Sequence, residues 1–261
     1  MVNMPTTPLS YVGERPLNGQ AAVVTGSTRN LGLAIAARLA GLGANIVVNY
    51  HDEARSEEAE KAADELRAYN TQVLVEQADV THVDDVKRLF DRTIKSLGRL
   101  DILVNNAGLI VKKPFADTTD EDFDRCFAVN TKGKFLTMRE AARRMENNGR
   151  IINIITTITA VTIPFYSVYA GSKGAVEHFT RGLAKEVGGR GITVNCVAPG
   201  PLDTSFYYPV ENEESIAHAK RLSIANRLGE IGEVVPLVAF LCCPDARWIT
   251  AQTIRVNGGM A

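Results

Sequence analysis

Short apolar runs alternate along the chain with longer segments in which apolar residues recur at helical spacing. Uncharged short runs predict buried strands, and recurrence at i, i+3 and i+4 predicts amphipathic helices. The predicted strands are 21–26, 45–50, 71–80, 101–108, 150–155, 192–199 and 252–259. The predicted helices are 30–44, 53–69, 83–97, 119–146, 167–187 and 230–243. This alternation predicts an α/β fold, a doubly wound Rossmann-type parallel sheet of about seven strands with helices on both faces.

Two segments depart from the alternation. Residues 1–18 precede the first strand, and we interpret them as an N-terminal extension to a single domain over 19–261. Residues 205–226 are mixed in composition, which predicts a loop with a short helix, of the kind that forms a lid over a site. Three aromatic residues, 206–208, either line a partly apolar pocket there or pack on the core.

Charge and composition narrow the class of protein. The 261 residues are 45% hydrophobic, enough for one sizeable core. A net charge of −1 argues against a nucleic-acid partner and against an anionic membrane surface. Apolar runs stay shorter than the ~20 residues that span a bilayer. The first 20 residues lack the pattern of a secretion signal, so we predict a cytoplasmic location.

The cysteines and histidines suggest packing rather than metal binding. Zinc sites and redox pairs use characteristic cysteine and histidine spacings, and we find neither pattern. We therefore predict no metal, and interpret the cysteines as small buried hydrophobic residues. They are Cys126, Cys196, Cys242 and Cys243, with histidines at 51, 82, 178 and 218.

The first predicted strand runs into a glycine-rich turn, TGSTRNLG (25–32). Glycines at a helix start let backbone N–H groups approach a pyrophosphate, and the helix dipole favours the anion. An ordinary strand-to-helix turn is the alternative. Because the turn 25–32 follows the first strand of an alternating strand–helix pattern, we favour dinucleotide binding.

Further motifs follow the later strands. With the first turn, NNAG (105–108), PGPLDT (199–204) and the tail 240–259 make the chain resemble the short-chain dehydrogenase/reductase family over about residues 18–261. Asn30 stands where that family has its middle glycine, and asparagine tolerates positive φ. Within the family, the chain is most similar to 3-oxoacyl-carrier-protein reductases and other secondary-alcohol enzymes. The tyrosine–lysine spacing disfavours the enoyl-reductase branch.

The resemblance implies cofactor-binding roles at several strand ends. These residues are Gly26, Thr28, Arg29, Asn30, Leu31, Gly32, Tyr50, His51, Asp79, Val80, Asn106, Gly108, Tyr169, Lys173, Pro199, Gly200, Leu202 and Thr204. Strand 45–50 ends without the acidic residue that binds the ribose of NAD, and a guanidinium such as Arg29 can clamp a 2′-phosphate. NADP(H) is therefore favoured over NAD(H). Asp52 and Glu53 argue the other way, and Arg29 as a solvated surface residue is the alternative.

Tyr169 and Lys173 are four residues apart, so they share one face of the predicted helix 167–187. A free phenol has a pKa of ~10. A nearby ammonium is expected to lower that pKa by ~2–3 units, which suits proton transfer to a carbonyl oxygen. Such pairs also occur on solvated helices. Tyr166 lies two turns from Lys173, so we expect it to line the pocket instead.

Two further groups complete the predicted catalytic set by resemblance. Thr156 stands thirteen residues before Tyr169, where the family has a serine hydroxyl that binds the substrate oxygen. Thr157 is expected to face the opposite side of the strand; both threonines also suit a strand on propensity alone. Asn130, within 119–146, corresponds to an asparagine that breaks the helix and holds a water in the proton relay; the alternative is a polar helix residue without a role.

These observations predict an NADPH-dependent carbonyl reductase, or the reverse alcohol dehydrogenase, acting on a small molecule. The alternative is a catalytically inactive NADP-binding protein that senses cofactor or assembles partners, because Asn30 and Thr156 depart from the family pattern. The resemblance also implies a homotetramer built from 119–146, 167–187 and the C-terminal strand.

Overall fold

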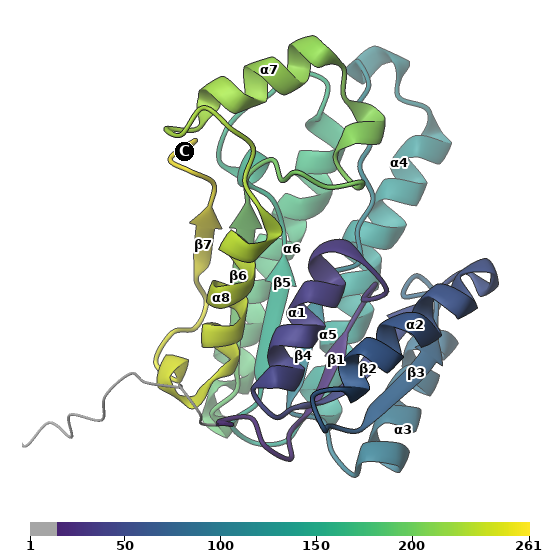
Figure 1. Ribbon diagram of the computed structural model, residues 1–261. Helices are drawn as coiled ribbons and strands as arrows, with labels where there is room; N and C mark the ends of the chain where they lie inside the picture. Colours follow the sequence, from purple (N-terminus) through teal and green to yellow (C-terminus); the bar gives the residue numbers. More distant parts are fainter. Residues whose placement is uncertain (1–14) are drawn as a thin grey trace, which may run out of the picture.

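A computed structural model of the protein describes residues 15–261 (Figure 1). Seven parallel strands form one sheet in the order β3-β2-β1-β4-β5-β6-β7. They are β1 (Ala21–Val24), β2 (Asn45–Tyr50), β3 (Val73–Gln77), β4 (Ile102–Asn105), β5 (Arg150–Ile154), β6 (Thr193–Pro199) and β7 (Thr253–Val256). Strand order reverses between β1 and β4, where such sheets form a ligand crevice at the carboxyl ends of the strands.

Helices cover both faces of the sheet. They are α1 (Asn30–Gly41), α2 (Ser56–Arg67), α3 (Val83–Leu97), α4 (Asp120–Phe127), α5 (Gly133–Arg144), α6 (Ser167–Val187), α7 (Glu213–Leu222) and α8 (Ile231–Cys242). Single-turn helices are η1 (Glu53–Arg55), η2 (Phe115–Asp117), η4 (Thr157–Thr159), η5 (Gly188–Arg190), η6 (Tyr208–Val210) and η7 (Pro244–Ala246), and η3 (Ala128–Lys132) is a π-helical turn. The predicted doubly wound α/β fold is confirmed.

The core has two layers because successive strand residues point to opposite faces. Ala22 and Val24 of β1 pack under α1, α2 and α8, whereas Val23 packs with α3, α5 and α6 on the other side. All four residues of β1 are buried. This explains why the strands are apolar runs without alternation, as expected of a parallel sheet covered on both faces.

The predicted helix 119–146 is divided. The π-helical turn η3 separates α4 from α5, and Gly133 begins α5. The predicted loop 205–226 contains η6 and the ten-residue helix α7, which lies above the carboxyl ends of the strands (Figure 1). In the described part of the chain, every helix is too short or too polar to cross a membrane.

The last residues of the predicted extension contact the domain. Leu17, assigned above to the extension, is fully buried and its N–H donates to the Leu42 carbonyl. Residues 15–18 therefore pack against the domain. Residues 1–14 of the predicted extension lie outside the described residues.

Candidate active site

A cavity of about 640 Å³ opens at the carboxyl ends of the strands. All the predicted cofactor-binding residues line it, and so does Thr156. Asn130 is fully buried behind the wall. One end, which we call the polar half, is lined by Arg29, His51, Arg55, Asp79 and Thr81. The other end, which we call the apolar half, is lined by Ile110, Ile158, Tyr166, Phe206, Tyr207 and Met260.

The glycine-rich turn brings backbone to the cavity surface. Gly26 has φ +63°, and a Cβ on Gly32 would lie 2.3 Å from the Gly26 carbonyl oxygen, so both positions require glycine. Asn30 has φ 49°, which confirms that asparagine tolerates this conformation. Its amide donates to the Ser205 hydroxyl at 3.0 Å, so its side chain contacts the segment that carries α7.

The N-terminus of α1 is open to an anion. Among the described residues, no side chain caps this helix, and its first turn holds no acidic group. Asn106 holds the turn against β4 by donating to the Thr25 and Gly26 carbonyls at 3.1 and 3.0 Å. Uncapped N–H groups, a helix dipole and close-approaching glycine backbone fit a dinucleotide pyrophosphate.

Positive charge gathers beyond the end of β2. Arg29 and Arg55 line the cavity, and both contact the Glu58 carboxylate, at 3.8 and 3.0 Å. The Asp52 carboxylate instead accepts a hydrogen bond from the Ala54 N–H. Sequence reasoning missed Arg55; a basic residue shortly after the second strand was the available signal.

Asn49 is a second residue that sequence reasoning missed. Its buried side chain accepts from the Gly26 N–H at 3.2 Å and donates to the Ala78 carbonyl at 3.0 Å. It therefore joins the first turn to the end of β3. A buried asparagine in an otherwise apolar strand was the signal.

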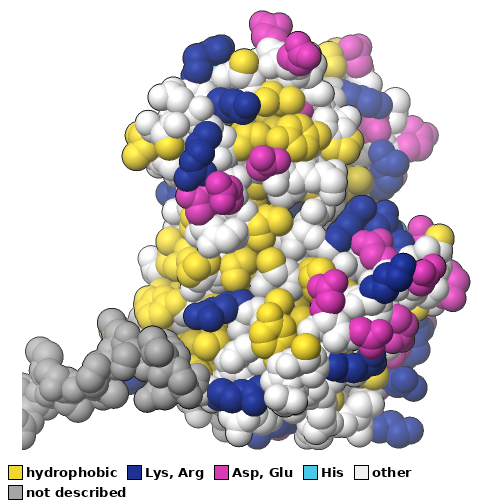
Figure 2. Space-filling model, viewed as in Figure 1, with side chains coloured by type: hydrophobic (Ala, Val, Ile, Leu, Met, Phe, Trp, Pro, Cys, Tyr) yellow, Lys and Arg dark blue, Asp and Glu magenta, His cyan; other side chains and the backbone are white. Residues whose placement is uncertain are grey.

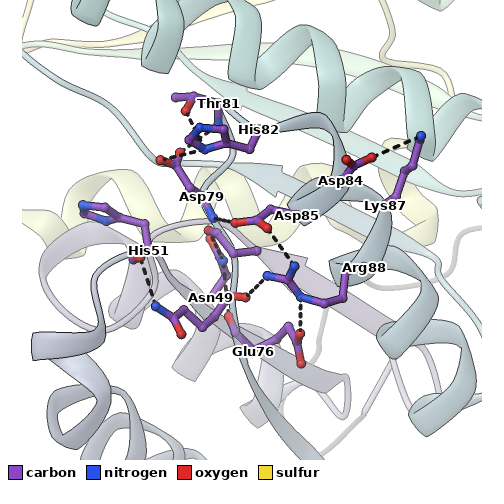
Figure 3. Close-up of polar contacts among 12 residues, drawn as sticks. Asn49, His51, Glu76, Asp79, Thr81, His82, Asp84, Asp85, Lys87 and Arg88 are labelled. Atoms are coloured by element: carbon purple, nitrogen blue, oxygen red, sulfur yellow. Dashed lines mark hydrogen bonds and ion pairs between the residues drawn. The ribbon is translucent and has the colours of Figure 1, made fainter.

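Polar contacts also hold the segment after β3, which carries the predicted cofactor-binding residues Asp79 and Val80 (Figure 3). The Asp79 N–H donates to the Asp85 carboxylate at 2.9 Å. The Asp79 carboxylate accepts a hydrogen bond from the Thr81 N–H and lies 3.2 Å from Nδ1 of His82. A hydrogen bond from Arg88 lowers the pKa of Asp85. Since Asp85 is held ionised as an acceptor, Asp79 has a fixed position.

Tyr169 and Lys173 lie in the first turns of α6, with 6% and 2% of their surfaces exposed. The Lys173 Nζ is 5.7 Å from the centroid of the Tyr169 ring, and it donates to the Ile154 carbonyl at 3.2 Å. Thr156 has extended backbone two residues after β5, where it caps η4, and its side chain interacts with that of Tyr169. The structure thus brings the three predicted groups together at the cavity.

The expected lowering of the tyrosine pKa is wrong for the protein's own residues. Burial raises the pKa of Tyr169, and the hydrogen bond with Thr156 offsets only part of this rise. Burial also lowers the pKa of Lys173 to about 8, because the ammonium is desolvated as well. Desolvation of the buried phenol outweighs the attraction of the ammonium that the sequence led us to expect.

Asn130 lies in the π-helical turn η3, which agrees with the predicted break in the helix. Such turns are frequent at functional sites. Its amide donates to the Leu109 carbonyl at 2.7 Å and to the Ser172 hydroxyl at 3.0 Å, and its oxygen accepts from the Leu109 N–H at 2.9 Å. These contacts hold the loop after β4 against α6.

The segment after β6 closes the cavity floor. The Gly200 N–H donates to the Val256 carbonyl, and a Cβ on Gly200 would lie 3.0 Å from the Cα of Asn257. Pro199, Leu202 and Thr204 line the cavity from this segment. Phe206 and Tyr207 line it too, whereas Tyr208 donates to Asp203 instead.

Charged groups behind the apolar half neutralise each other. The Glu211 side chain, 2% exposed, lies 2.5 Å from the Lys112 Nζ and accepts from the Tyr166 and Ser215 hydroxyls. Lys112 also lies 5.4 Å from the centroid of the Tyr166 ring. Burial and the hydrogen bond to Glu211 raise the pKa of Tyr166. Sequence reasoning missed Lys112 and Glu211, which are 99 residues apart in the chain.

The sequence is similar to those of known proteins over most of its length. A family model described as "Enoyl-(Acyl carrier protein) reductase" matches residues 26–261. An "NADPH-dependent aldehyde reductase-like protein, chloroplastic" from Arabidopsis thaliana is 42% identical over 258 residues, covering 94% of this chain and 95% of the relative. A short-chain type dehydrogenase/reductase from Picea abies is 41% identical over 256 residues, 93% of each chain.

Solved structures agree. A dehydrogenase from Burkholderia cenocepacia with bound NADP has a TM-score of 0.91 and 38% identity, covering 96% of each chain. A landomycin C-6 ketoreductase with bound NADP and rabelomycin has a TM-score of 0.85 and 34% identity, covering 95% of this chain and 98% of that one.

Fold and site together define an oxidoreductase of the Rossmann type. The chain belongs to the short-chain dehydrogenase/reductase family, as the sequence motifs predicted. The prediction of NADP(H) agrees with the NADP in these solved relatives.

Proposed function

We propose that the protein is an NADP(H)-dependent reductase that interconverts an uncharged ketone and a secondary alcohol, with Tyr169 as general acid and base. The observation that carries this proposal is the meeting of the Tyr169 and Thr156 side chains at a cavity that also bears the glycine-rich turn. Two hydroxyl groups side by side at a cavity wall can both donate to a carbonyl oxygen, which gains negative charge during reduction.

The polar half supports NADP(H) as the cofactor. When bound, the nicotinamide supplies or accepts the hydride. Arg29 and Arg55 would hold the 2′-phosphate, because guanidinium groups bind phosphate through paired hydrogen bonds. The chloroplastic relative, named as NADPH-dependent, supports the same choice.

Each catalytic side chain has a role in moving the proton. The raised pKa of Tyr169 keeps the phenol protonated at neutral pH, which suits an acid in the reductive direction. Thr156 would donate to the substrate oxygen. Lys173, with a pKa of about 8, carries its charge at neutral pH and would stabilise the phenolate left behind. Asn130 would hold the loop and the relay behind them.

The apolar half supports an uncharged substrate. Its walls are aliphatic and aromatic, and Lys112 and Glu211 satisfy each other behind Tyr166. A charged substrate would lose its hydration there without gaining a partner, which is costly. The name of the solved C-6 ketoreductase supports a ketone as the reacting group.

Enoyl reduction is a second candidate, because the matching family model carries that description. It requires hydride transfer to a carbon–carbon double bond. The four-residue spacing of Tyr169 and Lys173 argues against it. A catalytically inactive NADP-binding protein is the third candidate.

The deciding experiment follows absorbance of the reduced cofactor with panels of ketones and enoyl thioesters, each with NADPH and NADH. We expect turnover with ketones and NADPH. Tyr169→Phe should lower kcat by about 100-fold or more, since general acid catalysis contributes about 10²–10⁴-fold. Tyr166→Phe is the matched control: it should keep most of the kcat, while the KM for the ketone rises because the hydrogen bond to Glu211 is lost. Unchanged turnover in Tyr169→Phe rules out the proton donor; turnover of enoyl thioesters alone favours the second candidate.

We also propose a homotetramer. Phe135 of α5 and Phe179 of α6 are 44% and 37% exposed and lie edge to face, with ring centroids 6.1 Å apart. Trp248, near β7, is 94% exposed. Exposed aromatic groups on these elements support association through the helices and the C-terminal strand. Light scattering during size-exclusion chromatography tests the proposal, and a monomeric mass would contradict it.

A further inference from the structure

A second lysine is buried beside Lys173. Lys134 lies in the first turn of α5, directly after η3, and it is 2% exposed, as is Lys173. Its Nζ donates to the Ala107 carbonyl at 2.6 Å, in the segment after β4. The proposed mechanism gives this amine no role, although lysine is rarely buried without a partner.

The two amines lie at neighbouring residues of one loop: the Lys134 Nζ contacts the Ala107 carbonyl, and a Cβ on Gly108 would lie 3.2 Å from the Lys173 Nζ. In residues 15–261, no ion pair joins either amine to a carboxylate. The other titratable groups that face the pair are Cys126 from α4, Cys196 from β6 and Tyr169 from α6. Because two neighbouring ammonium groups repel strongly in a dry site, the pair favours a state in which one of the two lysines has lost its proton.

Lys134 is the member of the pair that loses its proton more readily. Burial and the charge of Lys173 lower the pKa of Lys134 well below its usual value, whereas that of Lys173 falls only to about 8. A neutral amine offers one lone pair, and an ammonium offers three N–H donors. Lys173 donates one N–H to the Ile154 carbonyl, so a second is available for the Lys134 amine and a third for the cavity that Lys173 lines.

We propose that Lys134 is a positioning residue, whose buried amine accepts a hydrogen bond from Lys173 and holds that cation toward Tyr169. This inference rests on the proposed function, because it assigns Lys134 a part in the same proton transfer. An apolar side chain at this position would leave one N–H of the Lys173 ammonium without a buried acceptor. Lys173 would then lose its proton at a lower pH.

The test compares Lys134→Met with Lys132→Met, an exposed lysine of the same helical stretch. Methionine keeps the length of the side chain and removes the amine. In Lys134→Met, the alkaline limb of the kcat/KM profile should shift down by about one pH unit, because Lys173 loses an acceptor that favours its charged form. In Lys132→Met the limb should stay in place. Equal limbs in wild type and Lys134→Met would overturn the proposal.

A conservative variant separates this role from mere support of the Ala107 loop. Glutamine offers both an acceptor for Lys173 and a donor for Ala107, so Lys134→Gln should return the limb most of the way to its wild-type pH. NADPH binding at pH 6, where Lys173 keeps its proton in every variant, should change by less than about threefold. If the alkaline limb of the kcat/KM profile shifts as far in Lys134→Gln as in Lys134→Met, Lys134 has only a structural role and the proposal is wrong.

A titration of lysine side chains by carbon NMR makes the result independent of turnover. With Lys173→Met used for assignment, the wild-type protein should show Lys173 titrating near pH 8 and Lys134 neutral at pH 7. Both lysines titrating near their usual pKa would contradict the proposal, even if Lys134→Met does not fold. If the wild-type protein reduces no ketone but the NMR titration gives the expected result, the proposed function is wrong. The interaction between Lys134 and Lys173 is then still supported.

Discussion

The two halves of the cavity are built in different ways. Charged side chains of both signs crowd around α2 and β3, next to the polar half, whereas hydrophobic side chains gather below α7 (Figure 2). The polar half comes from three short segments at neighbouring strand ends, 25–32, 49–55 and 78–81. The apolar half combines residues as distant as Ile110 and Met260.

This difference reflects what each half has to bind. A phosphate is recognised by backbone N–H groups and guanidinium groups, which a short turn can present by itself. An uncharged body is recognised by shape, which requires walls from several elements. Family motifs therefore concentrate in the polar half, and the apolar half can vary without breaking the turn.

The largest expected effect tests the polar half. Replacing Arg29 and Arg55 together by alanine should lower the preference for NADPH over NADH, measured as the ratio of kcat/KM values, by about 10–100-fold. A hydrogen bond to a charged group contributes about 1.5–3 kcal/mol, reduced here because the two side chains are 54% and 33% exposed. Michaelis constants for the ketone should hardly change.

A variant of Glu58 provides a control in which NADPH binding should become stronger instead of weaker. Its carboxylate contacts Arg29, Arg55 and the Thr28 hydroxyl, so it competes with an incoming phosphate and repels it. Glu58→Gln should strengthen NADPH binding by a few-fold and leave NADH binding unchanged. Equal losses for both cofactors in the double arginine variant would show that these residues support the fold rather than select the phosphate.

The second effect tests the apolar half. Glu211→Gln removes the charge that faces Lys112 and weakens the contact with Tyr166. The free energy of unfolding should fall by about 2 kcal/mol in urea titrations; breaking a fully buried pair costs about 3–5 kcal/mol, but the Lys112 side chain is 15% exposed. The KM for the ketone should rise several-fold, and NADPH binding should stay the same.

Two variants show whether that loss belongs to the ion pair. Glu214→Gln removes an exposed charge from the neighbouring α7 and should leave stability unchanged. The double variant Lys112→Met/Glu211→Leu removes both charges and should recover part of the stability lost in Glu211→Gln, since no buried charge remains unpaired. A double variant that is less stable than both single variants would argue against this explanation.

The same contrast explains how far the sequence could predict the structure. Strand and helix order followed from apolar patterning, and the glycine turn, Tyr169 and Lys173 followed from spacing along single elements. Glu211 could not be found this way, because its partners Lys112 and Tyr166 come from separate loops. Nor could the pKa of Tyr169, since burial depends on the packing of α4, α6 and the loop after β4 around it.

The smallest expected effect concerns Asn30. Its side chain joins the glycine-rich turn of the polar half to the segment that carries α7. Asn30 donates to Ser205 at 3.0 Å at an exposed position, where a hydrogen bond contributes about 0.5–1.5 kcal/mol. Asn30→Gly removes this contact and relieves the positive φ. We expect the KM for the ketone to rise about two- to fivefold, with stability unchanged or slightly higher.

Ser205→Ala should reproduce that rise, and the two changes together should exceed neither alone, because both remove the same hydrogen bond. NADPH affinity should vary by less than about twofold, since glycine suits this turn as well as asparagine does. If Asn30→Gly instead alters NADPH affinity and spares the ketone, the side chain acts within the polar half. The two halves would then be independent of each other at this point, and the segment 205–226 would owe its position to Glu211 rather than to the turn.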